Sequence, residues 1–176
     1  STNYYAVTSE KVFPQAAEFD QLLRNGFSFK SGRVINIFKT KKFHSFSLLT
    51  CSDFLSIKLR ALLQGKVQMV VVPSKNYDTS TFEHISESVL RDLHSVTIVC
   101  NDQKYGSSYC KIPYYDSKKR LIYSSSGHVR PACYTFSLDI KFVAESQQNG
   151  NPNVPNRSED ATNKVVPNFS LKNFKQ

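Results

Sequence analysis

The stretch FHSFSLLTCSDFLSIKLRALLQGKVQMVVVP, residues 43–73, predicts a strand, a helix and a second strand in succession. Residues 43–50 have the length and composition of a strand. Residues 52–64 begin with Ser52, a favoured N-cap residue, and are followed by Gly65, at the position where a helix usually ends. Val67–Val72 is apolar on both faces, as expected for a central strand. The leucines of the helical segment recur at helical spacing, at Leu55, Leu59, Leu62 and Leu63.

Further helices and strands are predicted on both sides of this stretch. Residues 14–25 start with Pro14 at a first-turn position and stop before Gly26, which is typical of a helix. Residues 81–92 form a second predicted helix, because Ser80 and Glu83 have capping-box spacing. Residues 133–143 alternate strictly between apolar and polar side chains, which predicts a strand with one buried face. The remaining strands are predicted at 27–38, 95–101, 109–115 and 119–125.

These elements together predict an α+β fold, in which a twisted antiparallel β-sheet packs with two or three helices. An all-β jelly roll is the alternative, since about eight short strands can be counted. We divide the chain into an N-terminal segment with a short helix (1–26), an α+β core domain (27–146) and a flexible polar tail that ends in a short apolar segment (147–176). The tail is assigned because Gln147–Asn163 contains almost no large apolar residues.

The chain is strongly basic, with 23 Lys and Arg against 14 Asp and Glu, a formal net charge of +9 and a pI near 9.4. Between positions 24 and 66, nine basic residues face a single acidic residue, Asp53. A second basic cluster, Lys118–Arg120, lies in a predicted turn. This surplus predicts binding to a polyanion, either nucleic acid or an acidic membrane surface. The candidate contact residues are Lys30, Arg33, Lys39, Lys41, Lys42, Lys58, Arg60, Lys66, Lys118, Lys119 and Arg120.

Two groups of hydrophobic residues are candidates for contacts outside the domain. Phe43 follows Lys41 and Lys42, and an aromatic side chain in such a setting either inserts into a membrane or partner or fills the core. The apolar residues near the C-terminus either dock on a neighbouring subunit or fold back onto the same chain. Those assigned to self-association are Phe169, Leu171 and Phe174.

The sequence contains none of the familiar catalytic or metal-binding motifs. It has no Gly-rich phosphate loop, no nucleophile elbow and no His-Glu-x-x-His pattern. Four histidines, at 44, 84, 94 and 128, and four cysteines, at 51, 100, 110 and 133, are scattered without zinc-ligand spacing. We interpret the cysteines as reduced core or near-core residues of an intracellular protein. We therefore expect no enzyme activity, no catalytic or metal site, no cofactor and no small-molecule substrate.

The order of the predicted elements provides a family resemblance. A long basic strand region, Arg33–Thr50, leads into a helix opened by Ser52 and Asp53, and Val67–Pro73 follows. The order is completed by Val96–Cys100, Tyr109–Tyr115 and Tyr134–Val143. This order is similar to that of the matrix proteins of rhabdoviruses. Because the chain is short and lacks their N-terminal budding motifs and Lys-rich arm, it resembles a plant-infecting, cytorhabdovirus-like member.

The resemblance implies a structural protein of the virion that self-assembles and bridges a helical ribonucleoprotein to the inner face of an anionic envelope. Its partners would be further copies of itself, viral nucleoprotein–RNA and the anionic membrane surface. It would be located beneath the envelope of the virion and at the membranes and in the cytoplasm of the host cell. The alternatives are a jelly-roll viral coat or movement protein that binds RNA directly, and an RNA-binding silencing suppressor.

Overall fold

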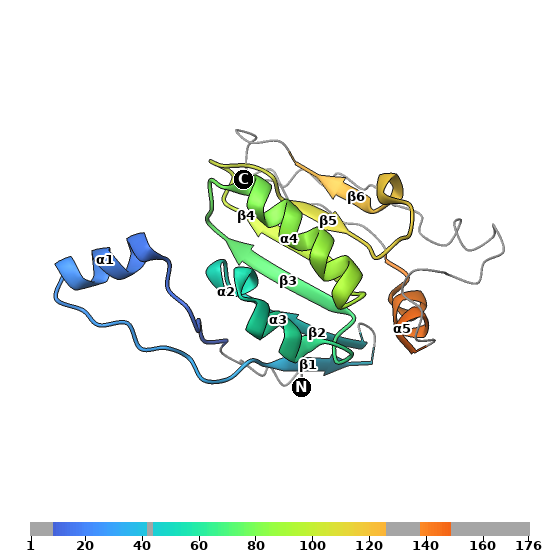
Figure 1. Ribbon diagram of the computed structural model, residues 1–176, viewed down its shortest axis with the longest axis horizontal. Coiled ribbons are helices and arrows are strands. Elements are labelled where there is room, and N and C mark those ends of the chain that lie inside the picture. The colour runs from blue at the N-terminus through green and yellow to red at the C-terminus, as the bar shows by residue number, and fades with distance from the viewer. Residues whose placement is uncertain (1–8, 42–43, 126–137, 149–176) are drawn as a thin grey trace, which may run out of the picture.

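The computed structural model describes residues 9–41, 44–125 and 138–148, and within this range one mixed six-stranded sheet carries the α-helices (Figure 1). The strands, in order across the sheet, are β1 (Ile37–Thr40), β2 (His44–Leu48), β3 (Met69–Ser74), β4 (Val96–Asn101), β5 (Tyr109–Lys111) and β6 (Leu121–Ser124). The helices are α1 (Ala16–Arg24), α2 (Ser52–Leu55), α3 (Ile57–Leu63), α4 (Thr79–Asp92), α5 (Ile140–Gln148) and the short 3-10 helix η1 (Ser117–Lys119). The predicted α+β class is confirmed, because a single sheet covered by helices is not a jelly roll.

The central strands of the sheet are parallel. β2 pairs with β3 and β3 with β4 in parallel, whereas β1–β2, β4–β5 and β5–β6 are antiparallel pairs. The parallel pairing follows from the connections, since α2 and α3 join β2 to β3, and α4 joins β3 to β4. The expectation of an antiparallel sheet therefore holds for the outer strands and is wrong for the central ones.

The predicted helix 52–64 is interrupted at Ser56. This residue has extended backbone angles (φ −72°, ψ 113°), and its hydroxyl oxygen accepts a hydrogen bond from the N–H of Leu59 at 3.4 Å. Ser56 thus ends α2 and caps α3, which agrees with the preference of serine for N-caps over helix interiors. In α4 the cap is Asp78, whose side chain accepts a hydrogen bond from the N–H of Thr81, so the helix begins earlier than predicted.

The strand predicted at 133–143 is wrong for its described part. Residues 126–137 lie outside the described residues, and α5 occupies Ile140–Gln148. The buried residues of α5 are Ile140, Val143 and Ala144, which have i, i+3 and i+4 spacing. The carboxylate of Asp139 accepts a hydrogen bond from the N–H of Phe142 and holds the first turn. A short apolar segment can fit both the strand period of two and the helix period of 3.6, and here packing against the sheet selects the helix.

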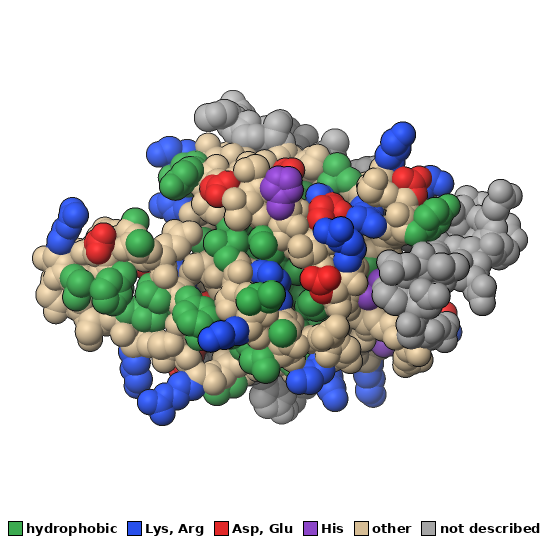
Figure 2. Space-filling view, in the orientation of Figure 1, with side chains coloured by type: hydrophobic (Ala, Val, Ile, Leu, Met, Phe, Trp, Pro, Cys, Tyr) green, Lys and Arg blue, Asp and Glu red, His purple; other side chains and the backbone are tan. Residues whose placement is uncertain are grey.

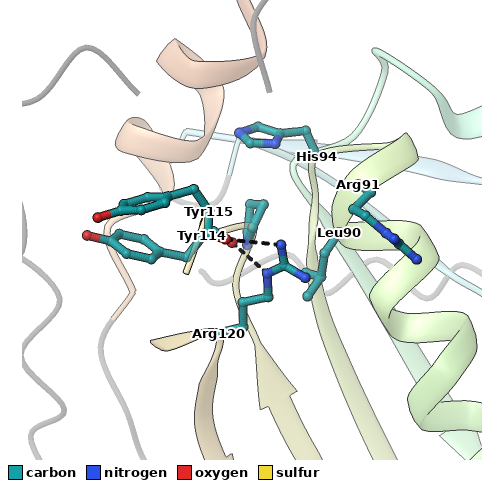
Figure 3. Close-up of a pocket in the computed structure, with 7 residues that line it drawn as sticks. Leu90, Arg91, His94, Tyr114, Tyr115 and Arg120 are labelled. Atoms are coloured by element: carbon teal, nitrogen blue, oxygen red, sulfur yellow. Dashed lines mark hydrogen bonds between the residues drawn. The ribbon is translucent and has the colours of Figure 1, made fainter. Parts of the chain in front are cut away.

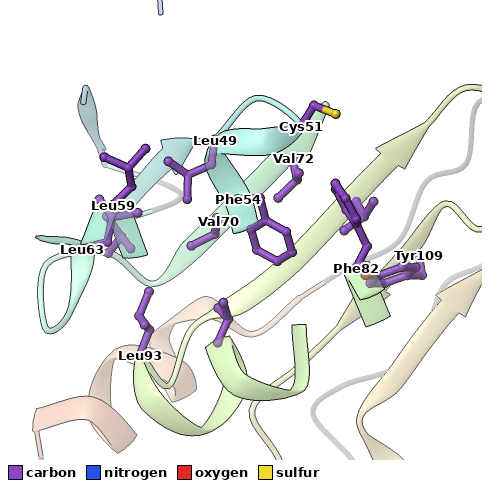
Figure 4. Close-up of a cluster of buried hydrophobic side chains, with 13 residues drawn as sticks. Leu49, Cys51, Phe54, Leu59, Leu63, Val70, Val72, Phe82, Leu93 and Tyr109 are labelled. Atoms are coloured by element: carbon purple, nitrogen blue, oxygen red, sulfur yellow. The ribbon is translucent and has the colours of Figure 1, made fainter. Parts of the chain in front are cut away.

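Two hydrophobic clusters cover the two faces of the sheet. The larger cluster lies between the sheet and α2, α3 and α4, and it includes Phe54, Phe82, Val70 and Val72 (Figure 4). The smaller cluster joins α5 to the opposite face through the alternate residues of β4 and β5. Among the described residues, no helix is long and apolar enough to cross a membrane.

Candidate active site

The parallel strands β2, β3 and β4 end at the same edge of the sheet, and the loops that follow them form the candidate site. In sheets with parallel strands, ligands usually bind outside the carboxyl ends of the strands. The loop after β2 leads through Cys51 into α2, the loop after β3 leads through Asp78 into α4, and the loop after β4 begins at Asp102. The backbone N–H of Cys51 donates to the carbonyl oxygen of Pro73 at 3.0 Å, so the loop after β2 is joined to the end of β3.

Cys51 occupies a strained turn between a strand and a helix. Its backbone angles are φ 47° and ψ −106°, and residues other than glycine rarely adopt a positive φ. The turn is held on its C-terminal side too, since the N–H of Phe54 donates to the Cys51 carbonyl at 3.0 Å. Figure 4 shows Cys51 at the margin of the larger cluster, with its sulfur directed away from Phe54 and Val72. Backbone strain of this kind is concentrated at functional sites, and a nucleophile elbow has this strand–turn–helix form.

A segment from the N-terminal part of the chain is fastened across this turn. The carboxylate of Asp53, which is 2% exposed, accepts hydrogen bonds from the N–H groups of Val12 (3.0 and 3.1 Å) and Phe13 (2.7 Å). The hydroxyl of Ser52 donates to the Phe13 carbonyl. The side-chain amide of Gln15 donates to Sγ of Cys51 at 3.2 Å. Residues 51, 52 and 53 therefore each hold part of the segment 12–15, and Gln15 covers the thiol, which belongs to a residue only 7% exposed.

Lys11 and Glu18 form an ion pair within this fastened segment. The Lys11 ammonium donates to the Glu18 carboxylate, which also accepts the backbone N–H of Gln15 at 3.2 Å. Burial raises the pKa of Glu18, but the hydrogen bonds from Lys11 and Gln15 and the charge of Lys11 outweigh it, so the pKa lies below its ordinary value. Glu18 is thus a carboxylate that orients the Lys11 side chain.

The backbone of Lys11 is also fixed from its other side. Gly32 donates its N–H to the Lys11 carbonyl at 2.9 Å, and the hydroxyl of Ser31 donates to the Val12 carbonyl at 2.7 Å. A Cβ atom at Gly32 would lie 2.6 Å from the Cβ atom of Glu10, closer than such atoms ever approach. The close contact explains why glycine occupies position 32, and it fixes where the Lys11 side chain starts.

The two loops beside the elbow are joined by Asn101, at the end of β4. Its side-chain oxygen accepts hydrogen bonds from the Ser74 hydroxyl (3.0 Å) and the Asn76 N–H (2.9 Å). Its side-chain nitrogen donates to the carbonyls of Asn76 (2.7 Å) and Gly106 (2.8 Å). With all these hydrogen-bonding positions used, Asn101 makes the loops after β3 and β4 one rigid unit.

The structure does not gather the predicted polyanion contacts on one face. Lys39 and Lys41 lie at β1 and Lys118 and Lys119 lie next to β6, at opposite edges of the sheet, with all four exposed. Lys30, Arg33, Lys58 and Lys66 are exposed as well. The candidates Lys42, Phe43, Phe169, Leu171 and Phe174 lie outside the described residues. Binding of a polyanion by the exposed residues stays a prediction.

Arg60 and Arg120 are tied up by contacts within the chain. Arg60 is 8% exposed and donates to the Phe54 carbonyl at 2.6 Å, which joins α3 to α2. Arg120 bonds the carbonyls of Tyr114 and Tyr115 beside a cavity of about 210 Å³ (Figure 3). Its Nη1 lies 2.6 Å from a carboxylate oxygen of Glu87, which also pairs with Lys111 at 2.8 Å. Neither arginine is freely exposed, and polyanion binding by these two residues stays a prediction.

Sequence reasoning missed every residue of the candidate site. The sequence predicts Cys51 as a reduced core or near-core residue, which its burial agrees with, but it predicts no reactive role for Cys51 and no role for Lys11, Gln15 or Glu18. One signal was present, because Cys51 lies directly between a predicted strand and Ser52, the predicted N-cap of a helix, which is the position of a nucleophile in an elbow. Among the described residues, no group of three or more His, Cys, Asp or Glu side chains is arranged to hold a metal.

The fold is shared with enzymes. A CN-hydrolase superfamily protein from Xanthomonas campestris matches with a TM-score of 0.54 and 9% identity, over 73% of this chain and 53% of that chain. Glutamine-dependent NAD+ synthetase from Acinetobacter baumannii matches with a TM-score of 0.54 and 18% identity, over 73% of this chain and 25% of that chain. An amidase of the nitrilase superfamily from Nesterenkonia sp. AN1 gives a TM-score of 0.48 and 16% identity, over 57% and 41%.

The matched part spans about half of the Xanthomonas chain and a smaller share of the other two. At these identities the similarity concerns the fold, which is that of CN-hydrolases. No family model and no curated protein matches the sequence.

These findings correct the functional interpretation of the sequence. The expectation of a non-enzymatic viral matrix protein is overturned, because the fold is shared with glutamine-dependent NAD+ synthetase and with a CN-hydrolase superfamily protein. The partners expected with it, namely a lattice of copies, nucleoprotein–RNA and an anionic membrane, are withdrawn. The expectation that the protein has no small-molecule substrate is withdrawn as well. The coat-protein alternative is withdrawn because the sheet is not a jelly roll. The location in a virion stays a prediction that none of these observations tests.

Proposed function

We propose that this chain carries a cysteine nucleophile that hydrolyses carbon–nitrogen bonds of amide type, with Cys51 as the nucleophile. The observation that carries the proposal is the strained turn at Cys51, which joins β2 to α2 beneath a segment that bears an ion pair. The shared fold with a CN-hydrolase superfamily protein supports the same class of reaction. Small amides are the simplest substrates of that class.

The reaction would follow two steps. Sγ of Cys51 attacks the amide carbon, the carbon–nitrogen bond breaks, and the thiol proton leaves with the nitrogen as ammonia or an amine. Water then attacks the thioester, releases the carboxylic acid and returns the proton to Sγ. Neither step needs an oxidant, a reductant or a metal. We assign proton transfer to Glu18, whose side chain is 42% exposed, because the Asp53 carboxylate is buried and holds two backbone N–H groups.

Both steps form an oxyanion, and two groups are suited to stabilise it. The Lys11 ammonium belongs to the segment fastened across the turn, and its charge would offset the developing negative charge. The backbone N–H of Ser52 follows the nucleophile directly and begins α2, so it has no acceptor within the helix. Gln15 donates a hydrogen bond to Sγ and so orients the sulfur beneath the segment 12–15.

The proposal is tested by ammonia release from a panel of small primary amides. Wild-type protein should release ammonia, and Cys51→Ala should abolish the release. Cys100→Ala should keep it, because Cys100 lies in β4 and β3 separates it from the turn. Lys11→Ala should lower the rate by at least about a hundredfold if it stabilises the oxyanion. Equal rates in wild-type protein and Cys51→Ala, with any amide that is cleaved, would contradict the proposal.

A further inference from the structure

Exposed hydrophobic side chains are concentrated on the part of the surface formed by residues 13–62. Of the eleven exposed large hydrophobic residues in the described part of the chain, eight belong to this stretch. Figure 2 shows such side chains extending from α1 toward the helices that cover the sheet. We call these residues the α1–α3 apolar surface: Phe13, Phe19, Leu23, Phe27, Val34, Leu55, Ile57 and Leu62, which are between 36% and 73% exposed.

α1 contributes an amphipathic helix that has nothing to cover it among the described residues. Phe19, Leu22 and Leu23 have i, i+3 and i+4 spacing on one side, and the helix contains no buried residue. Figure 1 shows α1 standing away from the sheet. An amphipathic helix normally buries its apolar stripe, so this stripe is available to a binding partner.

A groove continues this surface between α3 and the chain that leads into β1. It has a volume of about 290 Å³, and its apolar walls are formed by Ile35 and Ile37 on one side and by Leu59 and Leu62 on the other. The groove also contains Arg33 and Lys66, both of which are exposed. An apolar groove with cationic side chains suits a ligand that combines apolar groups with negative charge.

The charge around the surface argues against a second copy of the chain as the occupant. Five basic residues are exposed there against two exposed acidic residues, Glu10 and Asp20, and none of the five forms a salt bridge among the described residues: Arg24, Lys30, Arg33, Lys58 and Lys66. In a symmetric dimer the same patch faces itself, so these cations would face one another. Like charges brought together across an interface cost several kcal/mol, whereas acidic groups would be attracted.

We propose that the α1–α3 apolar surface binds an acidic amphipathic helix of a partner protein. The apolar stripe of the partner helix would lie along the groove and the stripe of α1, and its Asp or Glu side chains would pair with Arg33 and Lys66. This is the helix-in-groove mode, in which apolar residues at i, i+3, i+4 and i+7 supply the affinity and flanking charges select the partner. The peptide test measures binding directly and does not depend on amide hydrolysis, although the two regions adjoin, since Glu18 lies in α1 and Val12 and Gly32 line the groove.

The test uses three synthetic 18-residue helical peptides, measured by fluorescence anisotropy with the full chain. The first carries leucines at i, i+3, i+4 and i+7 flanked by glutamates, the second has lysines in place of the glutamates, and the third has serines in place of the leucines. The first should bind at least tenfold more tightly than the other two. The double variant Ile57→Ser, Leu62→Ser should weaken its binding at least tenfold, and the exposed residues chosen should leave the fold intact.

Charge reversal and a remote control complete the experiment. The double variant Arg33→Glu, Lys66→Glu should prefer the lysine peptide over the glutamate peptide. Leu121→Ser and Lys118→Glu, at the opposite edge of the sheet, should change nothing. The proposal is overturned if the glutamate peptide does not bind at about 100 µM, a weak affinity for such a groove. It is also overturned if the serine peptide binds as tightly, which would indicate charge alone, or if the chain dimerises through this surface in sedimentation.

Discussion

Asp53 offers the sharpest test of how the site is assembled. Its buried carboxylate accepts the N–H groups of Val12 and Phe13 and so holds the segment that carries Lys11 and Gln15 over Cys51. A hydrogen bond to a charged group contributes about 1.5–3 kcal/mol, so replacing Asp53 with alanine removes about 3–6 kcal/mol of attachment. The loss falls on the contact between residues 12–13 and the elbow, while the core between the sheet and α4 keeps its packing.

Hydrogen exchange and thiol alkylation would measure this effect. In Asp53→Ala, the amides of Val12 and Phe13 should lose about two to four orders of magnitude of exchange protection, since each 1.4 kcal/mol is a factor of ten. Cys51 should react faster with iodoacetamide, because Gln15 no longer covers its sulfur, and amide hydrolysis should fall. Asp20→Ala, which removes an exposed carboxylate from α1, is the matched control. Unchanged exchange at residues 12 and 13 would refute the reasoning.

Three further predictions concern single contacts. Gln15→Ala should raise the alkylation rate of Cys51 about fivefold, since one hydrogen bond contributes about 1 kcal/mol, and mass spectrometry of the labelled peptide checks this; a slower rate would mean that the amide activates the thiol more than it covers it. Gly32→Ala should lower amide hydrolysis while costing about 1–3 kcal/mol in urea unfolding, because its Cβ would displace the backbone of residues 10–11; full activity with a normal unfolding midpoint would show that this contact is not tight. Burial raises the pKa of Glu87, but the hydrogen bonds and charges of Lys111 and Arg120 outweigh burial and bring the pKa below its ordinary value of 4.5. The stability that this carboxylate contributes is present above the unfolded-state pKa and is lost as the pH falls through the folded-state pKa. Glu87→Gln should therefore be less stable than wild type at pH 7 and equal to it at about pH 2. A constant stability difference across that pH range would contradict the assignment.

The sequence predicts the elements that have strong local signals. Ser52, Gly65 and the leucines between them predict the helical region after β2, and the apolar run Val67–Val72 predicts β3. The break of the predicted helix 52–64 at Ser56 is harder to foresee, because serine is tolerated inside helices and becomes a cap only where the chain must turn. The prediction of a strand at 133–143 is wrong for a related reason. A few apolar residues fit both the strand period of two and the helix period of 3.6, and the packing of α5 against the sheet selects the helix.

The candidate site is beyond local reasoning because its parts come together only in the fold. Lys11 and Glu18 are about forty and thirty residues away from Cys51 in sequence, and each looks like an ordinary surface residue. The contact through Asp53 depends on a positive φ at Cys51, which no propensity predicts for cysteine. The basic surplus can be counted from the sequence, but its two clusters are separated by the sheet. One cluster lies at β1 and the other at η1, beside β6, and β1 and β6 are the opposite edge strands.

The turn at Cys51 also links reactivity to the integrity of the sheet. An unfavourable backbone conformation of order 1–3 kcal/mol persists only while Pro73 and Phe54 hold the turn on both sides. If β3 loosens from β2, the cysteine can relax into an ordinary conformation while most of the molecule stays folded. On warming, catalysis should therefore be lost a few degrees before the cooperative melting of the domain, and substitutions that weaken the β2–β3 pairing should widen that interval.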